Sequence, residues 1–122
     1  MSDRESYLDA QRELAQWASD AVVKDLVYAT GMRPDVTVDL WQDGWIRIII
    51  DRGYTAPSMT ARSEPDALVE VADYFQEQVD SLCWPTCPQH AVGLHAEVWN
   101  FSPVWRCHVG DHAVALIGRL GG

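Results

Sequence analysis

The 122-residue sequence predicts one small α+β domain with the element order αββαβββ. Two segments repeat apolar residues at three- and four-residue spacing, as amphipathic helices do. Shorter segments between and after them alternate apolar and polar residues, which is typical of strands with one buried face. Apolar residues make up 48% of the chain and six residues are Trp, which is ample material for a folded core.

The first helix is predicted over residues 2–30. Gly31 can adopt the left-handed conformation that ends helices, and Pro34 prevents the helix from restarting. The expected buried stripe contains Tyr7, Leu14, Trp17, Ala18, Ala21, Val22 and Leu26. Acidic residues on the opposite face are expected to face solvent; they are Asp9, Glu13, Asp20 and Asp25.

A β-hairpin is predicted over residues 35–51, with its turn at residues 42–44. A two-residue turn would pair apolar with polar residues and mix the two faces. A three-residue loop, with Gly44 left-handed in a G1 bulge, keeps the faces separate and is the preferred register. It pairs Val36 with Ile50, Val38 with Ile48, Asp39 with Arg47, Leu40 with Ile46 and Trp41 with Trp45.

The second helix is predicted over residues 64–82, with Ser63 and Asp66 forming a capping box and Pro65 in the first turn. Its buried stripe is Leu68, Val71, Ala72, Phe75, Val79 and Leu82, and its solvent face is Glu70, Asp73, Glu77 and Asp80. Three short strands then follow, at about residues 95–99, 104–107 and 113–117.

Charge divides the chain into two parts that we expect to pack as one compact unit. Residues 1–82, the acidic body, hold 16 acidic and 7 basic residues, whereas residues 83–122 hold two of each. All three Cys and all four His lie in residues 83–122, which we expect to form a Cys/His-containing subdomain.

The segment Cys87-Pro88-Gln89-His90 places two metal-ligand types at the C-x₂-H spacing of a zinc knuckle. Cys107 and His112 follow at the end of a predicted strand and beyond a glycine-containing turn. These four residues are the predicted Cys₂His₂ set of a structural zinc site resembling a zinc ribbon. Three competitors stay open, because Cys83, His95 or His108 could replace His112 as a ligand.

A resemblance supports this expectation. The segments Trp84-Pro85-Thr86-Cys87-Pro88-Gln89-His90, Trp105-Arg106-Cys107 and Ile117-Gly118-Arg119-Leu120 resemble a C-terminal signature of small uncharacterised actinobacterial proteins. That signature reads W-P-x-C-P-x-H, W-x-C and I-G-x-L. The resemblance covers about the last 40 residues and implies a zinc-ribbon-like tail without implying an activity.

Three classes of function follow from this site and from the formal net charge of −9. The preferred class is a non-catalytic, zinc-stabilised interaction or accessory protein, because four protein ligands leave no open coordination position. The alternative is a zinc-dependent hydrolase or deaminase-like enzyme, since His95-Ala96-Glu97 matches the H-x-E element of deaminases. Nucleic-acid binding is not expected, because the net charge repels phosphate.

The expected surroundings of the protein follow from the same composition. No apolar run of about 18 residues and no signal peptide are found, so we expect a cytoplasmic protein without membrane contact. The acidic helix faces suit a basic protein partner. Six Trp in so small a chain also leave open an exposed aromatic patch that serves a homodimer.

Overall fold

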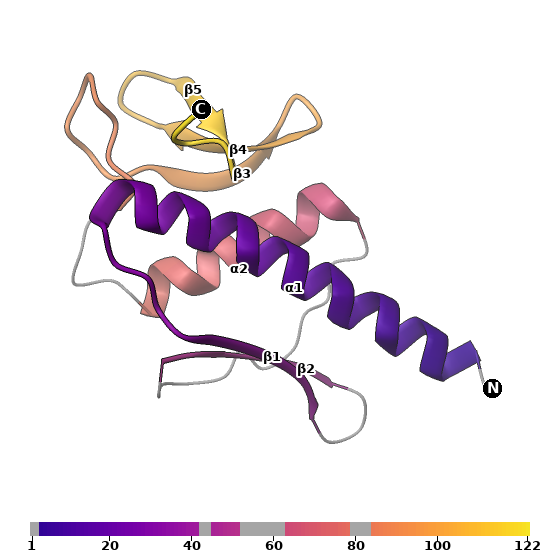
Figure 1. The fold of residues 1–122 in the computed structure, drawn as a ribbon. Helices are drawn as coiled ribbons and strands as arrows, with labels where there is room; N and C mark the ends of the chain where they lie inside the picture. Colours follow the sequence, from indigo (N-terminus) through magenta and orange to yellow (C-terminus); the bar gives the residue numbers. More distant parts are fainter. Residues whose placement is uncertain (1–2, 42–44, 52–62, 79–83) are drawn as a thin grey trace.

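The computed structural model describes residues 3–41, 45–51, 63–78 and 84–122. It confirms the mixed α+β class and the predicted order of elements (Figure 1). The helices are α1 (Asp3–Thr30) and α2 (Glu64–Gln78). The strands are β1 (Val36–Trp41), β2 (Trp45–Ile50), β3 (His95–Trp99), β4 (Ser102–Cys107) and β5 (His112–Leu116).

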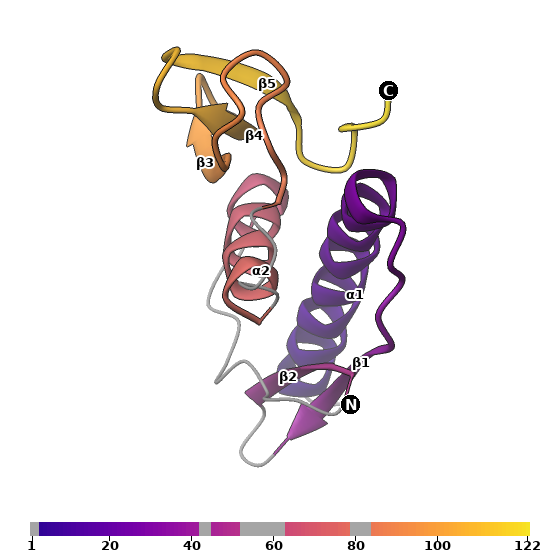
Figure 2. The ribbon, with the colours of Figure 1, turned by 90° about the vertical axis from the view of Figure 1, so that its left-hand side faces the viewer.

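The two helices lie side by side between two separate β-structures (Figures 1 and 2). The antiparallel β1–β2 hairpin covers one side of the helix pair. An antiparallel sheet of order β3-β4-β5 covers the other side, and the C-terminal end of the chain leaves β5 to lie near the end of α1. Neither described helix is long and apolar enough to span a membrane.

Helix α1 ends as predicted, and its buried face includes Ala18, Val22 and Leu26 of the predicted stripe but is shifted around the helix from it. The Gly31 N–H donates to the Val27 carbonyl at 2.8 Å, and Gly31 is left-handed with φ of 77°. Tyr7 and Trp17, predicted to be buried, are 44% and 43% exposed, and Asp25, predicted to face solvent, is completely buried. Periodicity predicts that one face of the helix is apolar. Which residues at the edges of that face are buried depends on the elements that pack on α1. The buried apolar residues of α1 are Ala15, Ala18, Val22, Val23 and Leu26.

The hairpin register is confirmed at every described pair. Val36 pairs with Ile50 and Val38 with Ile48, so Ile46, Ile48 and Ile50 all point into the core. On the other face, the Asp39 carboxylate accepts hydrogen bonds from Arg47 at 3.1 and 3.2 Å. Gly44 and its predicted bulge lie outside the described residues.

Helix α2 begins at the predicted cap, where the Asp66 N–H donates to the Ser63 hydroxyl at 3.4 Å. Its buried residues are Ala67, Leu68, Val71, Ala72 and Phe75. Asp73 and Glu77 are exposed as predicted, whereas Glu70 is half-buried. The predicted last turn, including Val79, Asp80 and Leu82, lies outside the described residues.

One hydrophobic core contains residues of both the acidic body and the C-terminal part. Trp105 and Leu94 belong to the same buried cluster as Val22 and Phe75. Trp84 packs edge-on against Trp105, with ring centroids 5.6 Å apart. Residues 84–122 therefore obtain part of their stability by packing on α1 and α2.

The buried carboxylate of Asp25 joins α1 to the last residues of the chain. It accepts hydrogen bonds from Trp105 Nε1 at 2.7 Å, from the Gly118 N–H at 2.6 Å and from the Leu120 N–H at 3.0 Å. Three N–H donors offset much of the cost of removing a carboxylate from water. In the sequence Asp25 belongs to an acidic stripe of α1, so the helical periodicity does not predict that its carboxylate is a buried hydrogen-bond acceptor.

Candidate metal centre

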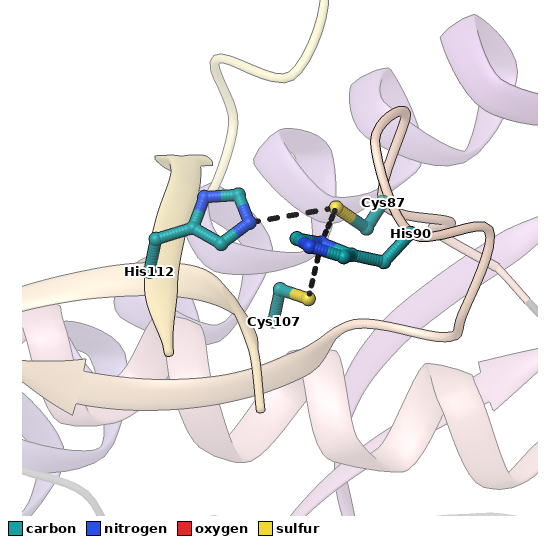
Figure 3. A group of neighbouring side chains, drawn as sticks. All are labelled: Cys87, His90, Cys107 and His112. Carbon is teal, nitrogen blue, oxygen red and sulfur yellow. Dashed lines mark hydrogen bonds between the residues drawn. The ribbon is translucent and has the colours of Figure 1, made fainter. Parts of the chain in front are cut away.

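A short hairpin of residues 85–94 positions Cys87 and His90. The Cys87 N–H donates to the Val92 carbonyl at 2.8 Å, and the Leu94 N–H donates to the Pro85 carbonyl at 2.8 Å. Between these bonds the chain turns sharply, with the Ala91 N–H bonded to the Cys87 carbonyl at 2.9 Å. The turn brings the two side chains of the C-x₂-H segment to the same side of the hairpin (Figure 3).

The turn between β4 and β5 positions the other pair. Cys107 ends β4 and His112 begins β5, and the two residues face each other in the antiparallel register. Asp111 is left-handed with φ of 51°, and the Gly110 N–H donates to Cys107 Sγ at 3.3 Å. N–H bonds to sulfur of this kind stabilise a thiolate, which is the form that binds metal.

The four predicted side chains converge in the structure (Figure 3). One ligand atom of each of Cys87, His90, Cys107 and His112 lies within 4.8 Å of all the others. Cys87 Sγ lies 3.4 Å from His90 Nδ1 and 3.6 Å from His112 Nε2, and Cys107 Sγ lies 3.4 Å from His90 Nδ1. Tetrahedral zinc with ordinary Zn–S and Zn–N bonds separates S from N by about 3.5 Å. The spacing of the donor atoms therefore fits a zinc ion.

Gly110 leaves space for the two histidine rings. A Cβ at this position would clash with His90 Cε1 and would lie 2.6 Å from His112 Cδ2. The rings themselves meet edge-on, with centroids 5.4 Å apart. The sequence shows a glycine in this turn, and the close approach of the two rings explains why a residue without a Cβ is needed there.

The environment of Cys87 favours the thiolate. Burial raises the pKa of the Cys87 thiol, but hydrogen bonds from His90, from the backbone of Gln89 and His90 and from Cys107 outweigh it. The pKa is lowered from 9.0 to about 6. Both described cysteines are buried and form no disulfide.

His95 and His108, the two histidines that were alternatives to His112 as a ligand, interact with each other and with Glu97 instead. His95 stacks on His108, with ring centroids 4.3 Å apart and planes 13° from parallel. His108 Nε2 lies 2.8 Å from Glu97 Oε2, and Arg106 donates to Glu97 Oε1 at 2.8 Å. Neither His95 nor His108 belongs to the converging group, and Cys83 lies outside the described residues.

Glu97, the candidate base of the alternative enzyme, is held by two neighbours. The hydrogen bond with His108 lowers the pKa of Glu97, burial opposes this effect, and Arg106 lowers the pKa further. A carboxylate with a lowered pKa is a weak base at neutral pH. The sequence shows an H-x-E element, but it does not show that Arg106 and His108 bind its glutamate.

Comparison with known protein families, with curated proteins and with solved structures finds no match for this chain. The functional assignment therefore depends on the site itself.

Proposed function

We propose that this chain is a non-catalytic accessory protein whose C-terminal part is held together by one structural zinc ion. The proposed ligands are Cys87, His90, Cys107 and His112. The observation that supports this proposal is the convergence of two thiols and two imidazoles within 4.8 Å. Bound zinc would link the 85–94 hairpin to the β4–β5 turn and would keep both thiols deprotonated.

The donor set supports a closed site rather than a catalytic one. Catalytic zinc keeps one position for water beside three protein ligands, whereas structural zinc takes four protein ligands. Glu97 interacts with Arg106 and His108 instead of approaching the converging atoms. These contacts favour the accessory protein over the hydrolase or deaminase-like alternative.

The proposed partner and location follow from charge and from the thiols. With a formal net charge of −9, the chain suits a basic protein partner and not nucleic acid. The proposed location is the cytoplasm, where a reducing environment keeps the two cysteines available as thiolates.

Elemental analysis of the purified protein, combined with four variants, tests the ligand set. We expect one zinc per chain, lost in Cys87→Ser and in His112→Ala. His95→Ala and His108→Ala are the matched controls and should retain the metal. Absence of bound metal from the wild type would overturn the proposal. Retention of zinc by His112→Ala together with its loss from His95→Ala would show that the ligand set is wrong and would favour the enzyme.

A further inference from the structure

A pocket with a volume of about 560 Å³ lies between the end of α1 and the 85–94 hairpin. Two of its lining residues, Tyr28 and Met32, are 65% and 47% exposed, so the pocket can be reached from solvent. Small-molecule sites in proteins have volumes of about 300–1,000 Å³. The pocket is therefore large enough to hold a small molecule. Its apolar walls include Tyr28, Ala29, Met32, Trp84, Val114 and Leu120.

The pocket is uncharged, although the chain has a formal net charge of −9. None of the described residues that line it has a charged side chain. An ion that entered it would give up its hydration without gaining a partner of opposite charge. The pocket therefore favours an uncharged ligand, and the rings of Tyr28 and Trp84 favour an aromatic one.

Trp84 adds a polar feature to this apolar lining. The residue is 4% exposed, and its ring packs edge-on against Trp105. The Trp105 N–H donates to Asp25, but the Trp84 N–H has no hydrogen-bond partner among the described residues. Buried donors in proteins are nearly always bonded. Because Trp84 lines the pocket, a ligand with an acceptor oxygen can supply the missing partner.

Two walls of the pocket belong to the segments that carry the candidate metal centre. Thr86 and Pro88 line the pocket and flank Cys87 in the hairpin. Val114, which also lines it, follows His112 by two residues in β5. The zinc ion proposed above would fix the hairpin and β5 relative to each other. The shape of the pocket should therefore depend on the metal, a coupling that rests on the proposed zinc site.

We propose that this pocket binds an uncharged aromatic small molecule that carries one hydrogen-bond acceptor, and that this ligand and zinc bind cooperatively. The aromatic part of the ligand packs against Tyr28, Val114 and Leu120, and its acceptor oxygen bonds to the Trp84 N–H. Zinc holds the walls in the shape that binds the ligand. By linkage, the ligand raises the affinity for zinc by the same factor as zinc raises the affinity for the ligand.

Prodan is a suitable probe, because it is an uncharged naphthalene ketone whose fluorescence shifts to the blue when it leaves water. Titration with the purified wild type should give a Kd of about 10–200 μM, as expected for a ligand of this size. Ala29→Trp should weaken binding at least about tenfold, because Ala29 is exposed and the larger side chain fills the pocket. Ala10→Trp changes another exposed alanine of α1, outside the pocket, and should bind prodan like the wild type.

Two further measurements test the acceptor and the coupling. Trp84→Phe should weaken the binding of prodan more than it weakens the binding of the same fluorophore without its ketone group. Saturating prodan should raise the affinity of the wild type for zinc at least about fivefold, measured by competition with a chelator. Ala29→Trp should bind zinc like the wild type but should lose this increase.

The outcomes separate the pocket from the zinc site. Lack of a blue shift with wild type at about 1 mM, or equal binding of prodan by Ala29→Trp, would overturn the ligand site even in a protein that carries zinc. Binding that Ala29→Trp abolishes, in a wild type that holds no zinc, would support the pocket and overturn both the zinc site and the coupling. Equal effects of Trp84→Phe on the two fluorophores would overturn the hydrogen bond to Trp84.

Discussion

Gly110 is the residue at which a single methyl group should disrupt the metal centre. In Gly110→Ala, the added Cβ would overlap the His90 ring and crowd His112 Cδ2 at 2.6 Å. Both rings must then move from positions that fit a tetrahedral ion. We expect zinc affinity to fall by about 10–100-fold, as when the immediate support of a metal ligand is lost. Competition with a chromophoric chelator measures this affinity.

Gly93→Ala is the control for that experiment. Gly93 lies in the 85–94 hairpin, close in sequence to Cys87 and His90, but a Cβ there meets nothing within 4 Å. Zinc affinity should stay within a factor of two or so of the wild type. An equal loss of zinc affinity in both variants would mean that the backbone conformation of the turns, and not the space left for the two histidine rings, determines the affinity.

Asp25 carries the largest expected single-residue effect on stability. Asp25→Ala would leave three donors without their partner, on Trp105, Gly118 and Leu120. Loss of a buried hydrogen-bonded carboxylate should cost about 3–5 kcal/mol of unfolding free energy in urea denaturation. Asp20→Ala, an exposed position on the same helix, should change it by less than about 0.5 kcal/mol. Similar values for the two variants would show that the Asp25 contacts contribute little.

At the scale of elements, α2 carries an unfavourable pair of like charges. Although Asp73 is exposed, partial desolvation of its carboxyl raises its pKa, Glu77 raises the pKa further, and His95 acts in the opposite direction. A raised carboxyl pKa means that the folded state prefers the protonated form. Stability therefore falls as pH rises from the ordinary value of 3.8 through the higher folded value, and the cost persists at neutral pH.

Glu77→Gln should relieve part of this cost. Asp73 and Glu77 are spaced i, i+4 on α2, where like charges destabilise a helix by about 0.2–0.5 kcal/mol. We expect the pKa of Asp73 to fall, measured by carboxyl NMR titration, and the protein to unfold at a higher temperature at neutral pH. The gain should vanish below the ordinary pKa of 3.8, where Asp73 is protonated in both states. Glu13→Gln on α1 should leave the Asp73 titration unchanged.

The helices and strands, and the register of the β1–β2 hairpin, could be predicted from the sequence more fully than the burial of single residues. Alternation of apolar residues sufficed for the β1–β2 register, because a one-residue slip would expose the isoleucines that the structure buries. Ligand spacing indicated the four residues that converge, but it left Cys83, His95 and His108 open as alternatives to His112. The burial of Asp25 and the exposure of Trp17 depend on which elements cover α1, and local sequence does not contain that information. The same holds for the stacking of His95 on His108.

At the scale of the whole molecule, the shared core couples the metal centre to the helices. The sequence predicts a Cys/His-containing subdomain, and a subdomain with a core of its own would unfold alone when its metal is removed. Cys87 and Cys107, however, belong to the same buried cluster as Val22 and Phe75. We therefore expect chelation of zinc to lower the unfolding temperature of the entire chain in one transition.

Circular dichroism can check this expectation with two signals. The far-ultraviolet signal reports α1 and α2, and the near-ultraviolet signal reports buried Trp84 and Trp105. The two melting curves should coincide before and after chelation, with the chelated protein less stable. Loss of the near-ultraviolet signal at a temperature where the helices remain would contradict the coupling.

The Asp25 contacts also have a consequence for the order in which the chain can fold during translation. The ribosome produces α1 well before the donors for its buried carboxylate, which are on Trp105, Gly118 and Leu120. Until residue 120 has left the exit tunnel, that carboxylate must stay hydrated, so the nascent helix cannot bury its C-terminal half in the native way. Domains often fold while synthesis continues. Residues 3–120 should instead complete their tertiary structure only after residue 120 has emerged.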